Sequence, residues 1–207
     1  MKRKPKQARA EATVSVILQA AAQVLLQRDY HSTSTNRIAE RAGVSVGSIY
    51  QYFDNKNEIY DAVLNHYLAG LVARLETVEF GPELSFAEIV ERLAFAIYHE
   101  WPDAPELLRK LRQAPDARVH DKLVDTKRLI VAFLRRTIDE RSQAAMMRDL
   151  DLALPILMDA IEGIFLNARS DMTPELFANE ISVLAERYLS VEGRGAESSS
   201  KPASSAS

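Results

Sequence analysis

The residues that decide the predicted fold run from Ser34 to Lys56 and read STNRIAERAGVSVGSIYQYFDNK. Ser34 can cap a short helix over residues 35–42, because serine side chains accept hydrogen bonds from the free amides at a helix start. The apolar residues of that helix, at 38, 39 and 42, fall on one face. Gly43 follows directly, where a residue without a Cβ atom closes the turn in the left-handed conformation.

A second short helix is predicted over residues 46–52, with Ser45 as its cap. Ile49 and Phe53 form its buried face, and Val44 can fill the small core between the two helices. Ala39 is small enough to let the helices approach closely at the turn. The sequence therefore predicts a helix-turn-helix, the geometry that places a second helix in the major groove of DNA.

The exposed side of the second helix is predicted to contact the duplex. The Gln51 amide can pair with an adenine edge, Ser48 can contact bases or phosphates, and Val46 can touch a thymine methyl group. Backbone phosphates, which set register rather than sequence, are the predicted partners of Thr35, Tyr50, Tyr52 and Lys56. Alternatively, Tyr50 buries its ring and Lys56 is simply solvated. The predicted DNA-contacting set is Thr35, Asn36, Ser45, Val46, Gly47, Ser48, Tyr50, Gln51, Tyr52 and Lys56.

Charge is distributed unevenly along the chain. Residues 1–56 carry nine basic and four acidic residues, a net charge of +5, whereas the remainder carries 17 basic and 25 acidic residues, a net charge of −8. This asymmetry favours contact between the first quarter and a polyanion, the alternative being a solubilising charge run. The basic arm from Lys2 to Arg9 either reaches along DNA or is a disordered tail that adds only nonspecific attraction.

The remaining sequence predicts helices throughout. Glycine and proline are scarce, at seven and eight residues, and apolar residues between them recur at three and four. No stretch alternates as a strand would. The chain is therefore predicted to be all-α, with about nine helices near residues 9–28, 35–42, 46–52, 56–79, 85–100, 104–113, 117–142, 149–169 and 174–190.

The segment TSTNRIAERAGVSVGSIYQYFDNKNEIYDAVL resembles the DNA-binding signature of the TetR (tetracycline-repressor) family, and the preceding VSVILQAAAQVLLQRDYHSTS resembles that family's first helix. The resemblance implies a three-helix DNA-binding domain followed by a helical bundle that binds a small-molecule effector and dimerises. It also implies a cytoplasmic repressor that binds a palindromic operator as a homodimer. The predicted division is a basic disordered arm at 1–10, the helix-turn-helix domain at 11–57, the regulatory and dimerisation domain at 58–191 and a disordered tail at 192–207.

Two sites are predicted in the C-terminal part. Residues 150–166 are apolar over more than one stripe, which fits burial on two sides, and in the family the last two helices form the dimer interface. The predicted interface residues are Leu157, Ile161, Ile164, Phe165, Ile181, Leu184 and Tyr188. Aromatic residues suggest an effector pocket, the alternative being ordinary core. Two acids within an apolar run could bind a cationic ligand, the alternative being the solvent edge of the helix. These predicted pocket residues are Phe95, His99, Trp101, Phe133, Asp159 and Glu162.

Several classes of protein are disfavoured. The chain has no cysteine, which excludes disulfides and thiolate metal sites, and no run of about 18 apolar residues that would predict a membrane span. Its four histidines lack metal-ligand spacing, and no phosphate-binding loop or nucleophile motif is present. We therefore expect no cofactor, no metal and no enzymatic activity. The alternative function is a regulator or architectural DNA binder without small-molecule control.

Overall fold

The computed structural model describes residues 5–77, 80–81, 83–114, 117–140, 149–169 and 171–190. Within these ranges the chain forms nine α-helices and one short 3₁₀-helix, with no β-strand, so the all-α prediction is confirmed. The first four residues of the predicted arm and the predicted tail at 192–207 lie outside the described residues. The helices are α1 (Pro5–Gln27), η1 (Tyr30–Ser32), α2 (Thr35–Ala42), α3 (Val46–Ile49), α4 (Lys56–Thr77), α5 (Phe86–Glu100), α6 (Ala104–Leu111), α7 (Ala117–Glu140), α8 (Leu150–Leu166) and α9 (Pro174–Leu189).

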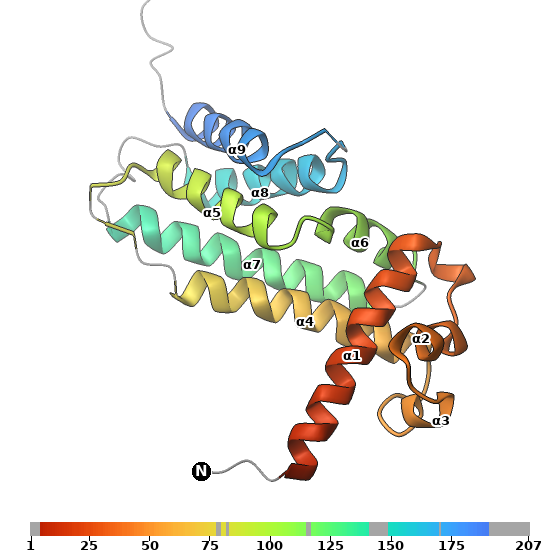
Figure 1. Ribbon diagram of the computed structural model, residues 1–207. Helices are drawn as coiled ribbons and strands as arrows, with labels where there is room; N and C mark the ends of the chain where they lie inside the picture. Colours follow the sequence, from red (N-terminus) through yellow and green to blue (C-terminus); the bar gives the residue numbers. More distant parts are fainter. Residues whose placement is uncertain are drawn as a thin grey trace, which may run out of the picture.

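The start of α1 corrects the predicted disordered arm. The helix begins at Pro5, so residues 5–10 of that arm are helical. Proline suits the first position of a helix because its fixed φ is helical and the amide hydrogen it lacks would have no partner there. Some of the basic residues near the N-terminus therefore lie on a helix that extends from the rest of the molecule (Figure 1).

Helices α1, α2, α3 and α4 share an N-terminal core. This core also contains residues beyond the predicted end of the DNA-binding domain. Ile17 and Leu25 of α1 pack with Ile38 of α2 and Ile49 of α3. The same cluster contains Leu107 and Leu111 of α6 and Val119 of α7. The predicted boundary at residue 57 therefore does not separate two independently packed units, because α6 completes the core of the helix-turn-helix domain.

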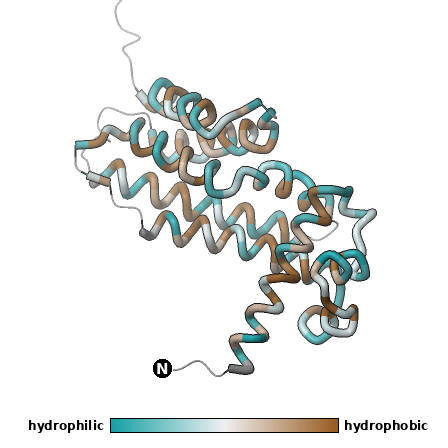
Figure 2. The backbone as a smooth tube through the Cα atoms, viewed as in Figure 1, coloured by the Kyte–Doolittle hydropathy of each residue, from teal (hydrophilic) through white to brown (hydrophobic). Residues whose placement is uncertain are grey.

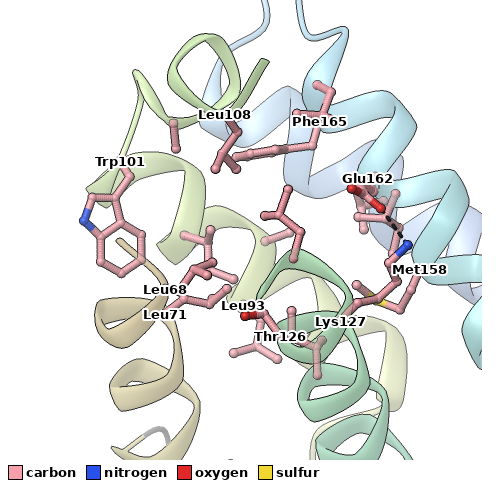
Figure 3. A pocket seen from close by; sticks show the side chains of 18 of the residues that line it. Leu68, Leu71, Leu93, Trp101, Leu108, Thr126, Lys127, Met158, Glu162 and Phe165 are labelled. Carbon is pink, nitrogen blue, oxygen red and sulfur yellow. Dashed lines mark ion pairs between the residues drawn. The ribbon is translucent and has the colours of Figure 1, made fainter. Parts of the chain in front are cut away.

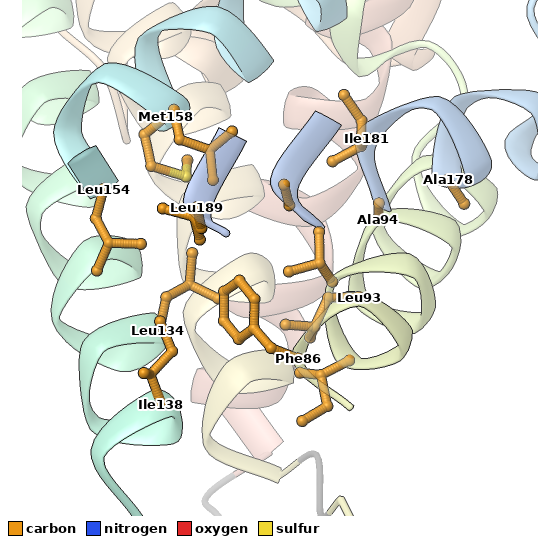
Figure 4. Close-up of a cluster of buried hydrophobic side chains, with 14 of the residues drawn as sticks. Phe86, Leu93, Ala94, Leu134, Ile138, Leu154, Met158, Ala178, Ile181 and Leu189 are labelled. Carbon is orange, nitrogen blue, oxygen red and sulfur yellow. The ribbon is translucent and has the colours of Figure 1, made fainter. Parts of the chain in front are cut away.

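A C-terminal core lies among α5, α7, α8 and α9 (Figure 4). The residues drawn there include Phe86 and Leu93 of α5, Leu134 of α7, Leu154 of α8 and Leu189 of α9. Helix α4 runs alongside α7 (Figure 1). Helices α8 and α9 lie at the end of the molecule far from α2 and α3 (Figure 1). The fold thus separates the helix-turn-helix from the last two helices by the length of the bundle.

Hydrophobic and hydrophilic residues alternate turn by turn along the long helices, as expected for amphipathic helices in a bundle (Figure 2). Residues Gln7–Gln27 of α1 are long and apolar enough to cross a membrane by length and composition alone. Ile17, Ala21 and Leu25 of that segment are fully buried in the N-terminal core. Packing against α2 and α4 therefore accounts for the apolar character of α1.

Candidate DNA-binding site and effector cavity

The caps predicted for the helix-turn-helix are confirmed. The Ser34 hydroxyl accepts a hydrogen bond from the Arg37 amide at the start of α2. Gly43 ends α2 with φ 66° and ψ 28°, a left-handed conformation that strains any residue with a Cβ atom. The Ser45 hydroxyl accepts from the Ser48 amide at 3.0 Å and so begins α3. These local bonds fix the angle between α2 and α3.

Helix α3 is shorter than predicted and ends at Ile49 rather than near residue 52. The chain continues as a turn in which the Phe53 amide still donates to the Ile49 carbonyl at 3.0 Å. Ile49 and Phe53 are both buried, as their predicted core role requires. The residues between them, Tyr50, Gln51 and Tyr52, are exposed. The reading surface is therefore the first turn of α3 together with this following turn.

Four of the five hydroxyl groups predicted to contact DNA form two pairs. The Thr35 hydroxyl at the start of α2 lies 3.4 Å from the Tyr50 hydroxyl, so the structure brings these two predicted phosphate contacts together. The hydroxyls of Ser45 and Ser48 are 2.8 Å apart and satisfy one another in the absence of DNA. Exposed hydroxyls of this kind can donate to phosphate oxygens. Val46 is less open than predicted, because it is partly buried against the N-terminal core.

Asn55 caps the start of α4. Its side-chain oxygen accepts hydrogen bonds from the amides of Asn57 and Glu58, at 2.9 and 3.1 Å. The Glu58 carboxylate accepts from the Asp54 amide at 2.8 Å rather than from the amide of Asn55. The reciprocal bond of a capping box is thus displaced by one residue, and it ties the turn after α3 to the first turn of α4.

Lys56 has partners within the protein that the sequence did not reveal. Its ammonium group donates to the carbonyl oxygens of Tyr30 and Thr33, at 3.0 and 3.2 Å, and lies 4.5 Å from the centroid of the Tyr30 ring. Burial lowers the pKa of this group. Two carbonyls and a ring face are a complete environment for a lysine. We infer that Lys56 primarily fastens η1 to α4, which revises its predicted role as a phosphate contact.

Replacing Lys56 with methionine is therefore expected to lower the free energy of unfolding by about 1–3 kcal/mol, since two carbonyl groups lose a charged donor. Urea denaturation of the whole chain measures this change. The control is Arg37→Met on the exposed surface of α2, expected to change stability by less than about 0.5 kcal/mol. Unchanged stability of the Lys56 variant, with a salt slope of DNA binding smaller by about one unit, would restore the phosphate role.

A cavity of about 210 Å³ lies between the two cores, lined by residues of α4 to α9 together with Trp101. Its walls are almost entirely apolar and include Leu68 and Leu71 of α4 and Leu93 of α5 (Figure 3). Drug-sized ligands occupy pockets of about 300–1,000 Å³, so this cavity suits a small or slender molecule. Trp101 packs against Gly70 of α4, where a Cβ atom would lie 2.7 Å from the indole ring. Glycine at that position is what permits this close approach.

Only some of the predicted pocket residues line this cavity. Trp101 and Glu162 line the cavity. Four predicted pocket residues, Phe95, His99, Phe133 and Asp159, are not among its lining residues. Phe95 and His99 stack on each other on the outer side of α5, and Phe133 packs on the edge of the C-terminal core. These four assignments are therefore wrong for this cavity, because helical spacing alone does not reveal which face of a helix is turned inward.

Charged groups gather at one side of the cavity, and the two cations among them, Arg112 and Lys127, were not predicted as pocket residues. Glu162 of α8 forms ion pairs with Arg112, which follows α6, and with Lys127 of α7, the latter at 2.7 Å. Lys127 also contacts Asp159 at 2.6 Å, and its hydrogen bonds to Asp159 and Glu162 raise its pKa. Figure 3 shows the Lys127–Glu162 pair on the side of the cavity opposite Trp101.

The residues predicted for the dimer interface fall into two groups that differ in burial. Leu157 and Ile181 are 1% and 2% exposed and belong to the C-terminal core of their own chain, so their assignment to an interface is wrong. The other predicted interface residues are half-buried at the edge of that core, namely Ile161, Ile164, Phe165, Leu184 and Tyr188. Larger apolar side chains stand exposed on the outer faces of α8 and α9: Leu152 at 64%, Ile156 at 45% and Leu176 at 46%. We call these three residues the outer apolar face.

A small helix-turn-helix with an exposed reading turn, carried on a helical bundle with an apolar cavity, defines a DNA-binding regulatory protein. The model of bacterial regulatory proteins of the tetR family matches residues 17–63. The transcriptional regulator YhgD of Bacillus subtilis is 26% identical over 66% of this chain and 72% of its own length. RutR of Escherichia coli is 32% identical over 63% of this chain and 59% of its own. A TetR-family regulator from Haemophilus influenzae superposes with a TM-score of 0.66 at 18% identity, covering 90% of this chain and 100% of that one.

Residues 17–63 therefore match the DNA-binding domain of TetR-family transcriptional regulators, and the chain as a whole has the fold of a solved member of that family. These relatives are named as regulators of transcription rather than as enzymes, in agreement with the class predicted from sequence.

Proposed function

We propose that this regulator binds a two-fold symmetric operator as a homodimer in the cytoplasm, represses transcription there, and leaves the operator when a small molecule occupies the cavity. The observation that carries the proposal is the apolar cavity, which is walled by helices of both cores. An architectural DNA binder has no need of such a cavity, so its presence favours effector control over the alternative function.

Helix α6 provides a physical link between the cavity and the helix-turn-helix. Leu107 and Leu111 are buried in the N-terminal core, and Leu108, which packs against the same core, also lines the cavity. The Lys110 ammonium group donates to the carbonyls of Leu26 and Arg28 at the end of α1, at 2.7 and 3.2 Å. A ligand that shifts α6 would thereby shift α1. The shift in operator affinity is bounded by the ligand's preference for one conformation over the other.

The outer apolar face supports the homodimer. Leu152 and Ile156 are one turn apart on the exposed side of α8, and Leu176 is exposed on the neighbouring α9. Exposed apolar side chains on adjacent helices can form an interface. Further along α8, a Cβ atom added to Gly163 would meet nothing within 4 Å, which leaves room for close approach of a partner helix. A symmetric dimer through this face would present two helix-turn-helix units to successive major grooves.

The proposal is tested by selecting bound sequences from random duplexes, locating the selected sequence in the genome, and placing it upstream of a reporter. Two symmetric half-sites and lower reporter output in the presence of the protein are expected. A library of small molecules is then screened for release of the operator duplex. A single asymmetric site, or a rise in reporter output, would overturn the dimeric or the repressor part. If no compound in the library releases the DNA, the part of the proposal that concerns small-molecule control is overturned.

Gln51 is expected to read sequence, because it is exposed in the turn after α3 and its amide can both donate to and accept from an adenine edge. Gln51→Ala should cost about 1–3 kcal/mol at one symmetric pair of operator positions, with fold and nonspecific affinity unchanged. The measurement is the binding profile of both proteins against all single-base changes of the selected operator.

The matched control is Gln113→Ala, which removes an exposed glutamine amide just after α6. Its profile should equal that of the wild type. If the Gln51 variant also keeps the wild-type profile, sequence is read by Asn36, Ser48 or Val46, or through DNA shape.

A further inference from the structure

The charged side of the cavity has an unequal number of cations and anions. Arg112 and Lys127 both line the cavity, and Glu162 is the acid that lines it with them. Glu162 serves both cations, one with each carboxylate oxygen. Asp159, the second acid in contact with Lys127, is mostly exposed and is not among the lining residues. The side chains that face the cavity therefore carry a net positive charge.

The pairing pattern decides which charge a ligand can bring. If Arg112 leaves Glu162, that carboxylate keeps Lys127, and Lys127 keeps Asp159 as well. Arg112 can therefore turn to an incoming anion without leaving a half-buried charge unpaired, which would be costly. An incoming cation would instead have to draw Glu162 away from two cations. A neutral polar group would gain less, because charge-assisted hydrogen bonds are the stronger ones.

The apolar part of the cavity determines the shape and polarity of the rest of the ligand. Trp101, Leu68 and Leu71 lie on the side of the cavity away from the charged group (Figure 3). Apart from the charged residues, the Thr126 hydroxyl is one of the few polar groups among the lining residues. The volume of about 210 Å³ favours a slender body over a bulky polycyclic one. We propose that the effector is a slender apolar molecule with one anionic group at its end, and that Arg112 binds this group in exchange for Glu162.

This inference rests on the proposed function of the cavity and also explains how binding could be transmitted. Arg112 is the residue that caps the C-terminus of α6, and its pair with Glu162 ties that end to α8. When a ligand anion replaces Glu162, this tie is broken, while Leu107 and Lys110 still hold α6 to the helix-turn-helix domain. Occupation of the cavity would thereby free α6 and α1 to move together.

Trp101 makes the test direct, because it lines the cavity and is the only tryptophan in the chain. Tryptophan fluorescence of the full-length protein is titrated with decanoate, decanol and decylamine, which share one chain length and differ in the charge of the head group. We expect decanoate to bind about tenfold more tightly than decanol, and decylamine to bind most weakly, since one charge-assisted contact is worth about that factor. Arg112→Gln should remove the advantage of decanoate over decanol and leave decanol binding unchanged.

The control variant is Arg109→Gln, on α6 three residues before Arg112, paired with Glu106 and outside the cavity lining. It should keep the wild-type order of the three compounds. Equal binding of decanoate and decanol, with both releasing operator DNA, would overturn the anionic head group but leave the proposed function standing. Tightest binding of decylamine would assign the ligand to Glu162 instead. If none of the three binds, the slender alkyl class is wrong, and effector control is judged by the separate library screen.

Discussion

Leu107→Ala is expected to lower the free energy of unfolding by about 2–5 kcal/mol, the usual range for truncating a fully buried leucine. Leu107 lies in α6, 50 residues beyond the predicted end of the DNA-binding domain, yet its side chain is completely buried in the N-terminal core. The space left behind would open in the N-terminal core, which α1, α2 and α4 share. We therefore expect hydrogen exchange of the α1 and α2 amides to accelerate, and operator affinity to fall with the population of the folded domain.

Two leucine-to-alanine controls separate this effect from general damage. Leu152→Ala removes an exposed side chain and should change the stability of the monomer by less than about 0.5 kcal/mol. Leu154→Ala empties an equally buried site in the C-terminal core and should accelerate exchange in α8 and α9 while α2 stays protected. If Leu107→Ala leaves exchange in α1 and α2 unchanged, α6 is not part of the core of the DNA-binding domain.

The part of the structure that could be predicted from sequence is the part built by short-range interactions. Ser34, Gly43 and Ser45 act on amides and backbone angles within three residues of themselves, so their presence specifies the turn between α2 and α3 directly. The error at the end of α3 has the same origin. Residues 50–52 keep the helical face that buries Phe53, but they do so as a turn, which apolar spacing cannot distinguish from a helix.

Features that depend on distant segments could not be predicted. Lys56 and Lys110 resemble solvated lysines in the sequence, and only the folded chain brings carbonyls of η1 and α1 within reach of their ammonium groups. The same holds for Arg112, which meets Glu162 across 50 positions of sequence. Leu157 was assigned to an interface because α8 is apolar on more than one side, and spacing does not reveal which side faces the protein's own core.

Ile156→Arg is expected to abolish the proposed homodimer without unfolding the monomer. The side chain is 45% exposed in the single chain, so an arginine there is tolerated by the monomer, but in a dimer through the outer apolar face it would be buried without a partner. Burying an unpaired charge costs several kcal/mol, which opposes association through this face. Light scattering should therefore give the mass of one chain.

The same variant should lose operator affinity by about 10²–10⁴-fold, because each half-site then binds its own monomer and the gain from linked binding is lost. Far-ultraviolet circular dichroism and the urea midpoint should match those of the wild type. Leu129→Arg is the matched control, since Leu129 is 55% exposed on α7 and lies outside the outer apolar face. That variant should remain dimeric and bind the operator normally. If instead Leu129→Arg separates the subunits and Ile156→Arg does not, the interface uses α7, and the pairing of α8 and α9 across the two-fold axis is wrong.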